Sequence, residues 1–131
     1  MKSSKSKMRL AQLAGLFSLV VIALLVMAAT GKNPTAVEGY VIDSACTYVK
    51  NLDKPVSSDC AKACAKAGSS LVILAKDGKI YWPIDDAMPA KSQNEKLLPY
   101  AGERVEVSGK IFNRGGSRAI VIESVKPAKT S

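Results

Sequence analysis

The chain of 131 residues contains no histidine. A Ser–His or Cys–His nucleophile pair therefore cannot form, and the side chain that most often acts as a general base is missing. Asp85 and Asp86 do not replace it as a catalytic pair, because adjacent residues of a polar loop point in different directions. The sequence thus predicts a protein that is not an enzyme.

Acidic residues are missing from the first thirty positions. Four cations in residues 2–9 precede an uncharged run from Leu10 to Thr30. Such charge stays on the cytoplasmic side of a membrane, and a run of about 20 apolar residues can cross it. We therefore expect residues 1–31 to be a cleaved signal peptide or an N-terminal hydrophobic helix that anchors the protein.

Neither alternative is decided by this segment, although its length slightly favours the anchor. A signal peptide has an apolar middle of roughly 7–15 residues and small residues before the cleavage site, and residues 26–29 match that pattern only in part. No cysteine ends the run, which excludes a lipid-modified cysteine there. We expect an exported protein, either anchored in the inner membrane and facing the periplasm or extracellular side, or secreted after cleavage.

Removing this leader halves the net charge. Residues 1–31 hold four of the nineteen Lys and Arg, so residues 32–131 carry fifteen against eleven acids, a balance of +4. That is ordinary for a soluble surface and gives little support for nucleic-acid binding. The expected partners are the membrane, through the N-terminal segment, and an unknown envelope protein or glycan.

The exported part has the length of one small domain. We expect a tether at 32–36, the domain at 37–126 and a disordered tail at 127–131. Apolar patterns predict five strands, at 37–44, 71–74, 79–84, 105–111 and 119–125. The continuous apolar run of the second predicts a strand that is buried on both faces or lies near the middle of a barrel.

Turns and helices complete the expected fold. Asp77-Gly78 predicts a tight primed turn, and residues 113–117 predict the loop of the last hairpin. A helix is expected from Ser57-Ser58-Asp59, which can cap its first turn, to about residue 67, just before Gly68. A second helix is expected at 90–98. The fold class is therefore mainly β with one or two short helices, and a small barrel would hide the strand edges.

Two stretches resemble a known group of proteins. Residues 37–46, with Cys60-x-x-x-Cys64, resemble small exported bacterial proteins of unknown function, and residues 100–109 with 120–125 are similar to the end of OB-like barrels. The resemblance implies a five-stranded OB-like β-barrel and an exported location, and no activity. Many members have Gly and then His after the first cysteine, where this chain has residues 47–50 without either.

Cys46, Cys60 and Cys64 are the residues whose spacing suggests chemistry. Outside the cytoplasm the expected state is a disulfide. A bridge between Cys60 and Cys64 would need geometry that a regular helix does not readily supply, so we expect Cys46 to pair with Cys60 or Cys64. Closing a loop of about 15 residues would contribute roughly 3 kcal/mol.

The third thiol has three interpretations. It can be a buried small side chain; Cys60 can be a redox thiol in the first helical turn; or all three cysteines can bind a soft metal ion, Cu or Zn. Zinc would need a fourth ligand, Asp43, Asp59 or water. The first interpretation, with no cofactor, is the main expectation, and the Cys-x-x-x-Cys spacing differs from that of thioredoxin-like enzymes.

Tyr81, Trp82, Arg114 and Arg118 are candidate ligand-binding residues, because aromatic side chains can stack on bases or sugars and the arginines add a basic rim. Packing in the core and a solvated basic loop are the competing interpretations. We therefore expect a non-catalytic binding or structural module of the cell envelope, stabilised by a disulfide. The alternatives are a metal- or thiol-handling protein and a small glycan- or oligonucleotide-binding barrel.

Overall fold

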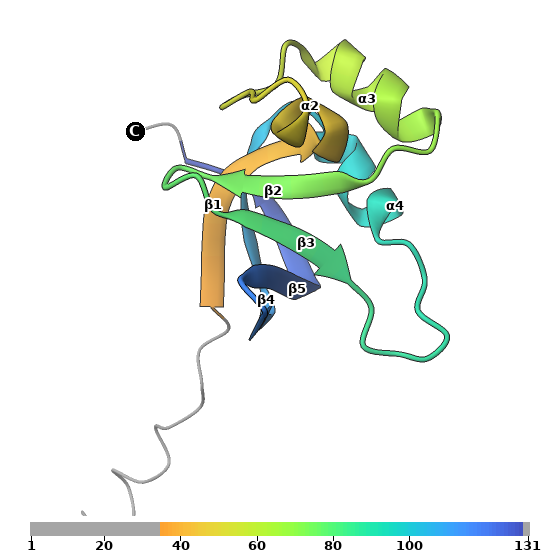
Figure 1. Cartoon of the computed structure of the whole chain (residues 1–131), viewed down its shortest axis with the longest axis vertical. Helices are drawn as coiled ribbons and strands as arrows, with labels where there is room; N and C mark the ends of the chain where they lie inside the picture. Colours follow the sequence, from red (N-terminus) through yellow and green to blue (C-terminus); the bar gives the residue numbers. More distant parts are fainter. Residues whose placement is uncertain (1–34, 130–131) are drawn as a thin grey trace, which may run out of the picture. The chain divides into compact units, whose positions relative to one another are not determined.

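The computed structural model describes residues 35–129 (Figure 1). The expected leader and most of the expected tether lie outside this range. The elements follow in the order β1 (Thr35–Asp43), α2 (Ser44–Tyr48), α3 (Ser58–Lys66), β2 (Leu71–Ala75), β3 (Ile80–Ile84), α4 (Asn94–Leu97), the 3-10 helix η1 (Leu98–Tyr100), β4 (Arg104–Arg114) and β5 (Ser117–Pro127). The fold is mainly β with a few short helices, as the sequence predicted.

The five strands pair in a closed order, β1-β2-β3-β5-β4. β1 pairs with β2 on one side and with β4 on the other, and β5 lies between β4 and β3. Four of the pairings are antiparallel, and only β3 and β5 run parallel. Every strand therefore has a partner on both sides, which leaves no strand wholly at an edge.

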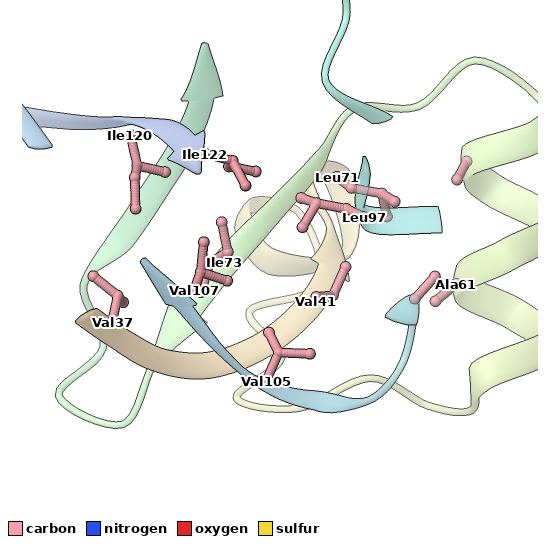
Figure 2. Close-up of a cluster of buried hydrophobic side chains, with 12 residues drawn as sticks. Val37, Val41, Ala61, Leu71, Ile73, Leu97, Val105, Val107, Ile120 and Ile122 are labelled. Atoms are coloured by element: carbon pink, nitrogen blue, oxygen red, sulfur yellow. The ribbon is translucent and has the colours of Figure 1, made fainter. Parts of the chain in front are cut away.

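The main core lies inside this ring, where alternate side chains of the strands meet (Figure 2). Residues two apart on a strand share a face, so β1 contributes Val37 and Val41, and β4 contributes Val105 and Val107. The helices add a few apolar side chains to this core: two alanines come from α3 and one leucine comes from α4. The other core members are Ala61, Ala65, Leu71, Ile73, Leu97, Ala101, Ile120 and Ile122.

β2 is buried on both faces, as its continuous apolar run predicted. Leu71 and Ile73 belong to the core inside the ring, whereas Val72 and Leu74 form a second cluster outside it with Ile42. Cys46, Leu52, Ile80 and Trp82 pack against this outer cluster. The segment between β1 and β2 therefore covers the outer face of the sheet.

The expected primed turn at Asp77-Gly78 is wrong. The amide of Gly78 donates to the carbonyl of Ala75 at 2.9 Å, and the amide of Ala75 donates to the carbonyl of Lys79 at 2.9 Å. Of the residues in this turn, only Gly78 has a positive φ, of 75°. This pattern is a three-residue loop with a bulge at the glycine, which competes with the two-residue turn whenever one position alone accepts positive φ.

Several element ends differ from expectation. β1 begins at Thr35, so two residues of the expected tether belong to the first strand, and β5 continues to Pro127, at the start of the expected tail. The helix expected at 90–98 is only α4 with η1 behind it, because Pro99 fits a first-turn position and the residues before Asn94 are irregular. Within residues 35–129, no helix is long and apolar enough to cross a membrane.

Candidate functional site

The three cysteines lie on two short helices between β1 and β2. Cys46 is in α2, and Cys60 and Cys64 are one turn apart in α3. Both helices lie near the same end of β1 (Figure 1). The connection between the two strands therefore brings all the cysteines of the chain into one region.

Asp43, the last residue of β1, starts α2. Its Oδ1 accepts a hydrogen bond from the amide of Cys46 at 2.9 Å, and its carbonyl accepts one from Oγ1 of Thr47 at 3.0 Å. An aspartate at this position satisfies an amide that the first helical turn leaves free. This hydrogen bond fixes the backbone position of Cys46 in the first turn of α2.

α3 begins and ends where the sequence predicted. Oγ of Ser57 accepts from the amide of Cys60 at 3.1 Å, and Gly68 takes the left-handed conformation, with φ of 102°. Ala61 and Ala65 are buried against the core, while Cys64 is half-buried and Cys60 is exposed. The two cysteines therefore flank the docked face of the helix instead of sharing it with the alanines.

The three thiols lie close to one another. Cys60 and Cys64 approach to 4.4 Å without a bond, and Cys46 lies near both of them. All three cysteines are unbridged in the structure, so the pairing stays a prediction. Both Cys60 and Cys64 therefore lie in the neighbourhood of Cys46.

A buried carboxylate adjoins this cluster. Asp43 is only 2% exposed, and its Oδ2 has no hydrogen-bond partner among the described residues. Burial, followed by the negative charge of Asp43, raises the pKa of the Cys46 thiol and that of the Cys64 thiol. Both thiols are thereby held in the protonated form, which is a poor nucleophile.

These shifts predict that the reduced protein loses stability in alkali. A thiol whose pKa is raised by folding stabilises the fold below the ordinary thiol pKa of about 8.5, and this contribution disappears as the pH rises through the folded pKa. Urea unfolding of fully reduced protein should therefore give a falling free energy above about pH 8.5. The double variant C46A/C64A is the control, and an equally steep fall in it would contradict the assignment.

Metal binding was the alternative use of the three cysteines. Within the described part of the chain, no group of three or more His, Cys, Asp or Glu side chains has the arrangement of a metal site. Asp43, one of the expected fourth ligands, does adjoin Cys46 and Cys64. Asp59 belongs to the first turn of α3 and is exposed.

The aromatic candidates separate onto the two faces of β3, as expected for neighbouring strand residues. Tyr81 packs against the core inside the ring, and Trp82 packs against the outer cluster. The ring of Trp82 stacks with that of Tyr48, their centroids 6.1 Å apart and their planes inclined by 19°. Tyr48 was not among the residues predicted from the sequence; its signal was its place two residues after Cys46 in a helix capped by Asp43.

The arginine candidates also separate. Arg118 lines a hollow with Trp82 and Tyr48, because β5 runs beside β3 and places Ala119 opposite Trp82. Arg114 is exposed at the end of β4 and does not line that hollow. Arg118 also lies opposite Tyr81 in the register and lines a second hollow with it. The structure thus brings Arg118 near both aromatic candidates and leaves Arg114 apart.

Comparisons of the chain with protein-family models, with curated proteins and with solved structures found no match. The function must therefore be argued from the geometry of the described residues.

Proposed function

We propose that the protein is an exported, non-catalytic module of the cell envelope, built on an OB-like barrel and stabilised by a disulfide between Cys46 and Cys64. The observation that carries this proposal is the shared setting of Cys46 and Cys64, which are both half-buried on neighbouring short helices while Cys60 is exposed. The closed strand order with one parallel pairing supports the OB-like assignment.

Burial and charge favour Cys64 over Cys60 as the partner of Cys46. Cys46 and Cys64 are both half-buried and both lie near the Asp43 carboxylate, whereas Cys60 is exposed. Oxidation removes two thiols whose ionised forms would be repelled by a buried carboxylate. A bridge between Cys60 and Cys64 would instead need to distort the single helix that carries both.

The chemistry of the chain supports a structural role for this bridge. The chain has no histidine to activate a thiol, and the raised pKa of Cys46 and Cys64 opposes thiolate formation. A domain of about 100 residues has a modest core, so a covalent link contributes a large share of its stability. The basic and apolar leader supports export into surroundings where such a link persists.

Peptide mapping tests the proposal directly. The protein is isolated from the envelope fraction, its free thiols are alkylated, and trypsin is added without reductant. Cleavage after Lys62 separates Cys60 from Cys64, and cleavage after Lys50 releases Cys46 on its own peptide. We expect the peptides 33–50 and 63–66 to be cross-linked and Cys60 to be alkylated.

Two other results would overturn the proposal. Alkylation of all three cysteines in native protein would show that no bridge exists. One equivalent of Cu or Zn, with three cysteines protected until the metal is removed, would show the metal-handling alternative. A bridge between Cys46 and Cys60 would support a module stabilised by a disulfide, but it would refute the assignment of Cys64 as the partner of Cys46.

A further inference from the structure

A hollow of about 260 Å³ lies beside the stacked Tyr48 and Trp82 rings. Its walls come from α2, the turn between β2 and β3, β3 itself and the turn between β4 and β5. Four separate parts of the chain therefore converge on one small depression. Its volume is below the roughly 300–1,000 Å³ of pockets for drug-sized ligands, which suits a single ring better than a larger molecule.

The aromatic wall remains accessible. Tyr48 is 58% exposed, and Trp82 is only partly buried although it packs on the outer cluster. Two aromatic rings in this state offer flat apolar surface to a ring-shaped ligand, as large aromatic side chains do at binding sites. Packing within the domain accounts for the inner face of Trp82, whereas the Tyr48 ring stacks only on Trp82 among the aromatic rings of residues 35–129 and stays largely exposed.

The opposite wall carries complementary polar groups. Arg118 takes part in none of the ion pairs found among residues 35–129, whereas Lys79 is paired with Asp77. Hydrogen bonds from Lys79 lower the pKa of Asp77, so its carboxylate stays ionised and can accept hydrogen bonds. The hydroxyl-bearing Ser117 lines the same wall. The hollow thus combines an unpaired cation, an acceptor and a hydroxyl.

We propose that this hollow binds a sugar unit that carries a carboxylate, within an acidic glycan of the cell envelope. The sugar ring lies against Tyr48 and Trp82, its hydroxyls donate to Asp77, and its carboxylate pairs with the Arg118 guanidinium, whose planar donors match a carboxylate. The site is separate from the cysteine bridge and goes beyond the proposed function.

A nucleic acid fits this hollow less well. Residues 35–129 carry fourteen Lys and Arg against eleven Asp and Glu, a balance of only +3. Strand binding depends on several phosphate contacts, and a single unpaired arginine supplies one.

Fluorescence of the sole tryptophan reports on the site itself, because Trp82 is the only one in the chain. The full chain is titrated with tetragalacturonate, with neutral galactotetraose as the matched control, and with an oligothymidylate. We expect a saturable change with the acidic sugar and a response at least about tenfold weaker with the neutral one, since hydrogen bonds to charged groups contribute this much.

Variants identify the contacting residues. R118Q should weaken binding of tetragalacturonate about tenfold or more, and Y48A should weaken it as well. R114Q is the matched control, because Arg114 is exposed at the same hairpin and outside the hollow. Unchanged far-UV circular dichroism and an unchanged Tm show that each variant remains folded.

Several outcomes would overturn the proposal. No response to either sugar would show that the hollow does not bind sugars, and an equal response to both would show that the carboxylate plays no part in binding. A response to oligothymidylate alone assigns the hollow to nucleic acid. Equal losses in R114Q and R118Q would show general charge attraction. None of these results affects the peptide map, so failure here is distinguishable from failure of the disulfide proposal.

Discussion

Replacing Cys46 with serine should lower the free energy of unfolding of the oxidised protein by about 3 kcal/mol, and replacing Cys64 should do the same. The proposed bridge would close a loop of about 18 residues, and removing it would return the entropy of that loop to the unfolded chain. For a domain of this size, such a loss lowers Tm by roughly 12–24 °C. Calorimetry of the oxidised variants beside the unaltered protein measures both quantities.

C60S is the matched control for this experiment. Cys60 lies in the same helix, one turn from Cys64, but it is exposed. Its replacement should change the free energy of unfolding by no more than about 0.5 kcal/mol, as for other surface substitutions. A large loss in C60S with little in C64S would place the bridge between Cys46 and Cys60, and three small losses would mean that no bridge forms.

The local parts of this fold are those that the sequence could predict. α3 was readable because Ser57, Gly68 and the spacing of Ala61 and Ala65 all act within a few residues of one another. The strands were readable for the same reason, since a period of two, or a continuous apolar run such as Leu71–Leu74, is a local pattern. Their pairing order depends on distant residues and has no comparable signal.

The part of the candidate site that the sequence did not predict depends on contacts between residues far apart in the chain. α2 has only five residues, too few for a helical period to show, and its cap at Asp43 resembled the end of a strand. Tyr48 therefore had no predicted partner. Arg118 comes close to Trp82 only because β5 runs parallel to β3, which no spacing in the sequence indicates. The two cysteine helices were likewise brought together by tertiary packing.

The backbone of α3 packs tightly against the segment between η1 and β4. Gly102, between η1 and β4, has φ of 86°, and a Cβ placed on it would lie 2.4 Å from Cα of Ser58 in the first turn of α3. The same junction is held by Oγ of Ser58, which donates to the carbonyl of Ala101 at 2.8 Å. A side chain at residue 102 would push the helix away from the core.

Gly102→Ala should therefore lower the free energy of unfolding by about 2–5 kcal/mol, the sum of roughly 1–2 kcal/mol for the left-handed backbone and 1–3 kcal/mol for overpacking. Gly68→Ala is the matched control, since Gly68 also has a positive φ but nothing lies within 4 Å of its added Cβ. It should show the backbone cost alone. Urea midpoints of both variants measure the difference.

The same substitution links this contact to the bridge, because α3 carries Cys64. A helix displaced from Ala101 should bring Cys64 less often within reach of Cys46, so reduced Gly102→Ala protein should reoxidise more slowly than reduced Gly68→Ala protein. Equal urea midpoints for the two variants would mean that α3 can shift at no cost. Cys64 would then be held near Cys46 by the α2 side of the cluster and not by the docking of α3.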